Sequence, residues 1–246
     1  MNDTLKTISM LRSARNDFTD KEIPEPLIKC IIDHSMKAAN ASNVQRYSMI
    51  YIDDKELLTL ITNKTTAKYA IVYCLDYNRI IETAHHMGYE YKPGTDNWYD
   101  IISGIFDVSA LAQTAVIAAA SLGIDTVITN SVLRQNQSEI VKRLNLPEKY
   151  CIAVMAVLFG YRDIPRNEQM NRLPQEYIVH HNQYHSLREE GHDSIIKIYD
   201  QIYPQYMDES HPHYLDYFFK EWCSPSKDDY NKELKDRMKE AGFEIK

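Results

Sequence analysis

The sequence predicts one globular domain that mixes helices with strands, and three observations support this fold class. Of the 246 residues 44% are apolar, which is enough for a large core. Helical segments alternate with short runs of aromatic and β-branched residues. The chain contains neither an internal repeat nor a low-complexity linker. We therefore expect one intertwined domain rather than two separate ones.

Short apolar runs predict the strands. Residues 47–53 (YSMIYID) and 69–76 (YAIVYCLD) are rich in the aromatic and β-branched side chains that strands favour. The continuous apolar run 151–160 (CIAVMAVLFG) is typical of a central strand that is buried on both faces. Residues 124–129 (IDTVIT) form a further candidate strand after Gly123, since glycine commonly follows the end of a helix.

Helical periodicity marks segments between these strands. Residues 23–40 carry proline early and then apolar side chains at spacings of three and four, which predicts an amphipathic helix. Residues 98–122 are apolar nearly all round and rich in alanine, so we expect a buried central helix that other backbones approach closely. Residues 136–146 (NQSEIVKRLNL) predict a short helix.

The character of the sequence changes after Gly160. Residues 161–186 are polar and contain prolines, and helical segments follow at roughly 187–207, 212–222 and 228–241, before a strand-like FEIK ending. Within a single domain, 1–246, we expect residues 1–160 to form the core and residues 161–246 to form a C-terminal extension. Because so polar a segment cannot bury itself, it is expected to wrap its own core or a second subunit.

Charge and cysteine usage restrict the partners and the compartment. The net charge of −7 and the absence of a Lys/Arg block argue against nucleic acid and anionic membranes as partners. The N-terminus does not read as a secretory signal, and Asp107, Ser109 and Gln113 interrupt the most apolar run, which argues against a membrane span. The four cysteines are widely spaced, so we expect reduced thiols and a cytoplasmic protein.

Several kinds of catalytic site are disfavoured by the sequence. It contains no Gly-x-Gly-x-x-Gly fingerprint, no phosphate-binding Gly-Lys-Ser/Thr loop and no Gly-x-Ser-x-Gly elbow. The nine histidines are not accompanied by a carboxylate or cysteine at ligand spacing, so no metal site is expected. If the chain is an enzyme, a bound cofactor carries the chemistry and no catalytic side chain is predicted.

Three polar segments could together bind a phosphorylated, planar cofactor. Arg12, Ser13 and Arg15, which we call the anion seat, offer two guanidinium groups and a hydroxyl for a phosphate. Residues 40–45 (NASNVQ) are dense in amides and hydroxyls that can address a heterocycle, and residues 129–135 (TNSVLRQ) form a polar loop after a strand. Taken singly, the three are better explained as a solvated helix face, a helix end and an ordinary turn.

The order of six segments along the chain carries a family resemblance. The segments RSARNDFTDKEI, NASNVQRY, CLDYNR, DVSALAQTAVIAAASLGI, LFGYRD and NRLPQEYIVHHNQY together resemble the nitroreductase family, in particular its oxygen-insensitive NADPH nitroreductase and NADPH–flavin oxidoreductase branch. The resemblance runs from about residue 8 to residue 190, and more weakly to the C-terminal RMKEAGFEIK. It implies an α+β homodimer with a mainly antiparallel sheet flanked by helices, FMN at the dimer interface, and a C-terminal extension that embraces the other subunit.

The resemblance also assigns residues to the FMN site. Arg12, Ser13 and Arg15 match the element that grips the FMN phosphate and ribityl chain, and Arg172 matches an arginine that completes the phosphate site. The remaining matches concern the flavin ring. They are Asn40, Ser42 and Asn43 of the amide-rich loop, Thr66 near the ring, and Ile128, Thr129, Asn130 and Ser131 along it.

Four departures from the family pattern stand out. Asn130 and Ser131 replace two glycines, Met170 replaces a lysine, and one extra residue stands between Arg15 and Phe18. Where NADPH-using members carry an arginine-rich loop, this chain reads YMDESHPHY at residues 206–214. An acidic loop repels the 2′-phosphate of NADPH, so we expect no strong preference for NADPH over NADH.

These observations predict an FMN-dependent oxidoreductase that transfers hydride from NADH or NADPH to a nitroaromatic, a quinone or free flavin by a ping-pong mechanism. The alternative is an FMN-binding dimer that acts as a sensor, carrier or partner-binding protein without robust NAD(P)H turnover. A structural dimer that binds no flavin is a further alternative. The physiological acceptor does not follow from the sequence.

Overall fold

The computed structural model describes residues 1–14, 17–62, 65–134, 137–163, 172–223 and 228–244. Its helices are α1 (Asp3–Ser9), α2 (Glu25–Ser35), α3 (Lys55–Thr62), α4 (Asn78–His86), α5 (Trp98–Ser121), α6 (Gln137–Arg143), α7 (Glu189–Ile202), α8 (Tyr214–Tyr217) and α9 (Asp228–Glu240). Its strands are β1 (Tyr47–Ile52), β2 (Tyr69–Asp76), β3 (Asp125–Thr129) and β4 (Cys151–Gly160). Two short 3₁₀ helices, η1 (Ala41–Asn43) and η2 (Ser131–Leu133), border the site considered below.

The chain divides into two compact units. Residues 1–167 and 229–246 form the first unit, which holds the whole sheet, and residues 168–228 form the second, which holds α7 and α8. The first unit therefore takes in both ends of the chain, and the second is inserted between them in sequence.

The first unit is built on an antiparallel sheet whose described strands run in the order β1-β2-β4-β3. Tyr47 faces Leu75 across β1 and β2, and Asp125 faces Gly160 across β3 and β4. The two inner strands, β2 and β4, are buried along nearly their whole length. The predicted central strand at residues 151–160 is thus confirmed, as is the predicted α+β fold class with an antiparallel sheet.

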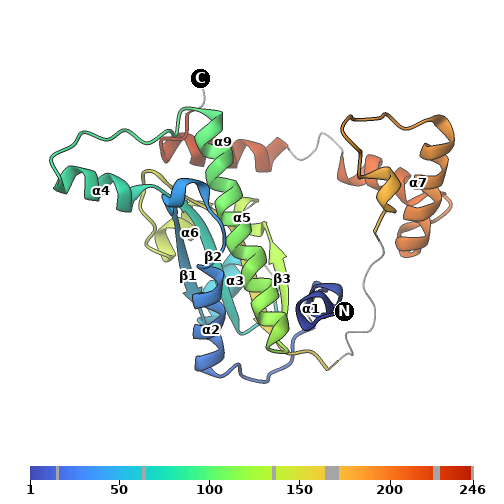
Figure 1. Cartoon of the computed structure of the whole chain (residues 1–246), viewed down its shortest axis with the longest axis horizontal. Helices are drawn as coiled ribbons and strands as arrows, with labels where there is room; N and C mark the ends of the chain where they lie inside the picture. Colours follow the sequence, from blue (N-terminus) through green and yellow to red (C-terminus); the bar gives the residue numbers. More distant parts are fainter. Residues whose placement is uncertain (15–16, 63–64, 135–136, 164–171, 224–227, 245–246) are drawn as a thin grey trace. The chain divides into compact units, whose positions relative to one another are not determined.

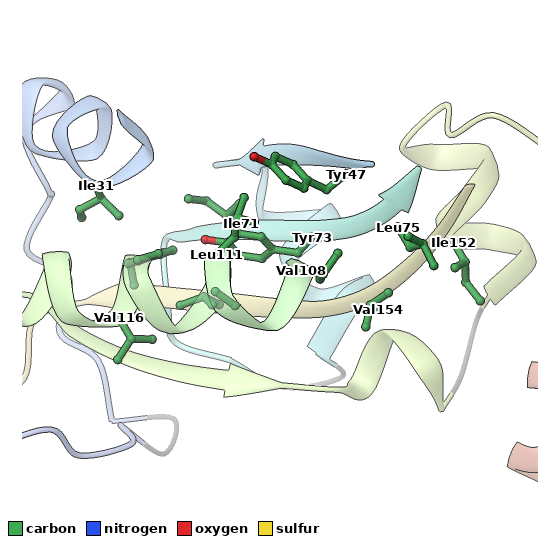
Figure 2. Close-up of a cluster of buried hydrophobic side chains, with 14 of the residues drawn as sticks. Ile31, Tyr47, Ile71, Tyr73, Leu75, Val108, Leu111, Val116, Ile152 and Val154 are labelled. Carbon is green, nitrogen blue, oxygen red and sulfur yellow. The ribbon is translucent and has the colours of Figure 1, made fainter. Parts of the chain in front are cut away.

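The two faces of the sheet pack against different helices, because side chains alternate along each strand. Ile71, Tyr73 and Leu75 of β2 point into the core shared with α2 and α5 (Figure 2). Val72 and Cys74, the residues between them, pack into a second core with α3 and α6. Burial of each large apolar side chain stabilises such a core by about 1.5–3 kcal/mol. The unit therefore has three layers, with helices on both faces of the sheet.

Helix α5 lies across one face of the sheet (Figure 1), so the predicted helix is confirmed, but it is buried on one side only, because Tyr99, Ile102 and Phe106 are exposed. A Cβ on Gly104 would lie 2.4 Å from Leu75 Cδ1, so the glycine permits the close approach of α5 to β2. Among the described residues α5 is the one helix long and apolar enough to cross a membrane by length and composition. It carries the fully buried charge of Asp107 and packs on α2 and the sheet, as the core helix of a globular unit does.

The end of the chain returns to the first unit through α9. Arg237 is buried and donates to the backbone carbonyls of Glu148 (3.2 Å) and Cys151 (3.0 Å). Gly242 adopts a left-handed φ of 80°, and the amide of Phe243 donates to Met238 O at 2.8 Å, which closes the helix end. The predicted strand at FEIK is wrong for its two described residues, because the backbone at Phe243 completes this helix cap instead of pairing with a strand.

Candidate functional site

The first part of the site is a segment that we call the strap, residues 11–14 and 17–19. The amide of Ala14 donates to Thr126 O at 2.8 Å, and Ser13 forms a parallel bridge with Thr126 at the start of β3. This pairing buries Ala14 and leaves Arg12 half-buried and Ser13 exposed. Arg12 and Ser13 of the anion seat are therefore fixed beside the β3 edge of the sheet, with polar groups accessible to a ligand.

The far end of the strap is fixed by separate contacts. The amide of Thr19 donates to Tyr161 O at 2.7 Å, and the amide of Phe18 donates to Thr66 Oγ1 at 2.9 Å. The Phe18 ring is buried over Gly160, where an added Cβ would lie 2.5 Å from Phe18 Cδ1. Thr66 thus lies beside the strap, and its hydroxyl holds the strap backbone. This placement is what we expect if Thr66 and the anion seat belong to one site.

The second part of the site is the turn that leaves β3. Ile128 is 41% exposed at the edge of the sheet, and it is followed by Thr129, Asn130 and Ser131. The Thr129 and Ser131 hydroxyls are hydrogen-bonded, and the Ser131 amide donates to Thr129 Oγ1 at 3.2 Å. Asn130 has a φ of −104°, so this turn requires no left-handed residue where the family has glycine. The departure at Asn130 and Ser131 is therefore compatible with an unstrained backbone.

The third part of the site is the amide-rich loop between α2 and β1. Ser42, Asn43 and Gln45 all have φ values of 54–55°, a left-handed conformation that is rare for residues other than glycine. Helix α5 holds the start of this loop, because Asp107 Oδ1 accepts a hydrogen bond from the amide of Ala41 at 2.8 Å. Clustered strain of this kind is typical of ligand-binding segments.

A buried charge network lies beneath this loop. Arg46 Nη1 donates to Asp100 Oδ1 at 3.0 Å, and Arg46 Nε lies 3.7 Å from Asp107 Oδ2. Burial works against the charge of Arg46, but hydrogen bonds to Tyr77 and Asp100 outweigh it, so the pKa of the guanidinium is raised. Arg46 therefore stays charged, and the network joins the loop to α5.

The three parts of the site do not meet within one chain. The strap and the turn after β3 share one edge of the sheet, whereas the loop with Asn40, Ser42 and Asn43 precedes β1 at the opposite edge. Neighbouring strands lie about 4.8 Å apart, so three intervals separate the edges by roughly 14 Å. The described chain thus holds two separate groups of candidate residues, one at each edge of the sheet.

Comparisons with known proteins identify the family. Residues 59–161 match the model described as "Nitroreductase family", and residues 171–246 match "Nitroreductase family, C-terminal domain". The chain belongs to the nitroreductase family. The FMN reductase (NAD(P)H) of Bacillus subtilis (strain 168) is 29% identical over 217 residues, which cover 84% of each protein. The CR(VI) reductase of Pseudomonas sp. (strain G-1) is 28% identical, with 99% of each protein covered.

Solved structures share the nitroreductase fold over the whole chain. B. megaterium NfrA2 matches with a TM-score of 0.84 at 24% identity, covering 100% of both chains. The NADPH:FMN oxidoreductase from Vibrio harveyi, complexed with NAD+, matches with a TM-score of 0.79 at 22% identity, covering 96% of this chain and 98% of the other. At these identities the likeness concerns the fold alone.

Two nitroreductase motif positions, Arg15 and Met170, lie outside the described residues. Arg172 is exposed and belongs to the second unit. Its part in a phosphate site therefore remains a prediction of the family resemblance, as does that of Arg15.

The acidic loop at residues 206–214 is ordered by its own carboxylate. Asp208 Oδ1 accepts from the Ser210 amide (2.8 Å), the Ser210 hydroxyl (2.7 Å) and the His211 amide (2.8 Å). The Ser210 hydroxyl bond is the largest contribution, and together these bonds lower the pKa of Asp208 to about 2. His213 is hydrogen-bonded to Asp200 at 2.8 Å, which raises the pKa of its imidazole. The loop therefore keeps a carboxylate charge across the physiological pH range.

The buried charged residues that hold the segments of the site in place were not predicted from the sequence. Asp107 was noted only as an interruption of an apolar run, and Arg46 and Arg162 received no role. A single charged residue on the buried face of a long apolar helix was the available signal, because such a charge requires a buried partner. Its partner lies 61 positions away in the chain, and only the fold brings the two together.

Proposed function

We propose that this member of the nitroreductase family is an FMN-dependent oxidoreductase that uses NADH or NADPH to reduce nitroaromatics, quinones or free flavin. The observation that carries the proposal is the strap, which fixes Arg12 and Ser13 on the same sheet edge as the exposed turn Ile128–Ser131. The name of the B. subtilis FMN reductase, which is 29% identical to this chain, supports the choice of FMN.

The groups on this edge fit FMN chemically. The Arg12 guanidinium and Ser13 hydroxyl are donors that a phosphate needs when it leaves water. The exposed Ile128 side chain offers an apolar surface to a planar ring, and the polar turn after it offers hydrogen-bonding groups to the ring edge. Arg15 and Arg172 are proposed as further phosphate cations, and Thr66, Thr129, Asn130 and Ser131 as groups near the ring.

A homodimer would complete the site. The loop with Asn40, Ser42 and Asn43 lies at the wrong edge of its own sheet, so we propose that it reaches the ring bound by a second copy. Helix α5 supplies a surface for that copy. Its large exposed apolar side chains recur at helical spacing and are Trp98, Tyr99, Ile102, Ile105 and Phe106. Such a patch on a globular protein is typical of a protein interface.

The second unit fits a role as an embracing extension. None of the described residues of α7 and α8 is buried, although these helices carry an aromatic cluster. In this cluster the rings of Tyr203 and Tyr214 stack at 4.3 Å and those of Tyr206 and Tyr217 at 4.9 Å. We propose that a second subunit covers this unit, since it gains little burial by itself.

Within this proposal the protein binds and orients, and no catalytic side chain is required. When bound, FMN supplies the chemistry of hydride transfer between the nicotinamide and the acceptor. Arg12 and Ser13 of the anion seat would hold the phosphate, and the turn after β3 would lie beside the ring. Donor and acceptor then use the same space in succession, which gives ping-pong kinetics. All four cysteines are free thiols, which supports a cytoplasmic location.

The absorbance spectrum of the purified protein tests this function. We expect a yellow protein with one FMN per chain, whose flavin band is bleached by NADH without air and restored by a quinone. A yellow protein that neither nicotinamide bleaches would favour the sensor or carrier alternative. A protein that stays colourless after incubation with FMN would contradict the flavin site altogether.

Steady-state rates test the nicotinamide preference. The carboxylate of Asp208 and its neighbour Glu209 repel the 2′-phosphate of NADPH, so we expect kcat/KM values for NADH and NADPH to agree within about tenfold, or about 1.4 kcal/mol. The same data, plotted double-reciprocally at several quinone concentrations, should give parallel lines. A hundredfold preference for NADPH would contradict the role of the loop, and crossing lines would contradict the ping-pong order.

A further inference from the structure

Asp17, at the point where the strap has one residue more than the family pattern, makes an ion pair that the resemblance leaves unexplained. Asn16 and Asp17 stand between Arg15 and Phe18, where the family has a single residue. Asp17 Oδ2 pairs with Arg162 Nη2, just beyond the end of β4. A negative charge is thus placed two residues after Arg15 and five after Arg12, in a segment that is expected to bind an anion.

The pair is largely removed from water. The Arg162 side chain is 3% exposed and that of Asp17 is 29% exposed. Asp17 Oδ1 and Arg162 Nε are buried without a hydrogen-bond partner among the described residues. Because water screens such a pair weakly, loss of either charge is felt by groups nearby.

The same strap backbone carries both this pair and the accessible groups of the anion seat. Ser13 is held at Thr126, and Thr19 is held at Tyr161, which directly precedes Arg162. Both described ends of the strap are thus anchored, and Asp17 lies on the same short segment of chain as Arg12 and Ser13. Any uncompensated charge at Asp17 acts on whatever anion occupies the seat.

We propose that Arg162 is a positioning residue for the phosphate of FMN, because it neutralises Asp17 and holds the end of the strap. The proposal rests on the proposed FMN function, and it explains how the anion seat can bind a phosphate although Asp17 lies on the same segment. Arg162 touches no ligand in this scheme. It acts through Asp17, so the two residues have opposite effects on phosphate binding when they are changed singly.

The signs of these effects separate the electrostatic role from a structural one. Arg162→Gln leaves a carboxylate beside the seat and should raise the Kd for FMN about tenfold, or about 1.4 kcal/mol. Asp17→Asn removes the carboxylate and leaves a cation, so FMN should bind as tightly as before or more tightly. The double variant Asp17→Asn/Arg162→Gln should return the Kd to within about threefold of the original. A pair that only stabilised the fold would weaken FMN binding in both single variants.

The experiment titrates FMN-free protein with FMN and follows the quenching of flavin fluorescence, with circular dichroism to verify folding. Arg143→Gln is the matched control, since Arg143 of α6 pairs with Glu56 of α3 at 3.1 Å in an exposed ion pair, and its loss should leave the Kd unchanged. Arg162→Lys keeps the charge and should keep the Kd within about threefold. If Arg162→Gln does not fold, the comparison of Arg162→Lys with Asp17→Asn decides the matter.

The proposal is overturned if Asp17→Asn weakens FMN binding as much as Arg162→Gln does, or if Arg162→Gln folds and binds FMN unchanged. Weaker FMN binding by both single variants, Arg162→Lys and Asp17→Asn, overturns it as well. Failure of the proposed function is distinguishable, because the unaltered protein would then show no saturable quenching of FMN in any of these titrations.

Discussion

Phe106→Glu is expected to convert a homodimer into monomers and to release FMN. Phe106 is 66% exposed on α5, on a face that also carries Ile102 and Tyr99. A carboxylate introduced there would be buried without a partner, which costs several kcal/mol per subunit. The Kd for dimerisation should therefore rise by roughly two orders of magnitude or more, since each 1.4 kcal/mol is a factor of ten.

Loss of FMN should follow from loss of the dimer, because the strap and the amide-rich loop occupy opposite edges of one sheet. Sedimentation velocity gives the oligomeric state, and the flavin absorbance per chain after gel filtration gives the retained FMN. Ser138→Glu is the control, since it adds the same charge at an exposed position on α6, across the sheet from α5. A Phe106→Glu protein that remains dimeric, or a monomer that keeps its FMN, would show that α5 does not form the interface that completes the site.

The elements that could be predicted from the sequence are those whose apolar residue pattern indicates burial. The run 151–160 is apolar throughout because both faces of β4 are covered, and the predicted bounds agree with the observed strand. The same holds for β2 at residues 69–76. The short helices α1, α3 and α4 were not predicted, although the equally short α6 was. Helices of this length depend on tertiary contacts, such as the burial of Leu58 and Ile61 in α3, more than on propensity.

The candidate site was predictable as a list of residues and not as an arrangement. Arginines beside a serine, and amides beside a hydroxyl, indicate anion and heterocycle binding by chemistry alone. Their arrangement depends on contacts between distant segments, such as Ser13 with Thr126 and Phe18 with Thr66. The separation of the amide-rich loop from the anion seat is set by strand order, which no local pattern specifies. The loop with Ser42 and Asn43 is likewise anchored from a distant segment, because Asp107 of α5 accepts the amide of the adjacent Ala41.

Asp107→Leu is expected to have the largest effect on stability. Asp107 is fully buried in α5, accepts the amide of Ala41 at 2.8 Å and lies 3.7 Å from Arg46. Its removal leaves the half-buried amide of Ala41 without this acceptor and the buried Arg46 guanidinium with one carboxylate fewer. Breaking a buried ion pair in this way costs about 3–5 kcal/mol, a large share of the roughly 5–15 kcal/mol that stabilises a typical protein. For a chain of this size, the midpoint of thermal unfolding should fall by roughly 10 °C.

Two milder variants separate the parts played by charge and hydrogen bonding at Asp107. Asp107→Asn keeps an oxygen that can accept from Ala41 and loses only the charge, so its unfolding midpoint should lie between those of Asp107→Leu and the unaltered protein. Asp100→Asn is the matched control, because Asp100 is 32% exposed and contacts the same guanidinium, so its loss should cost only about 1 kcal/mol. Circular dichroism during heating measures all three. Equal midpoints for Asp107→Leu and Asp100→Asn would mean that the buried carboxylate does not anchor the loop to α5.

With the anchor removed, the loop with Ser42 and Asn43 loses the contact that holds it to α5. FMN affinity should therefore fall in Asp107→Leu even at temperatures where the variant is fully folded.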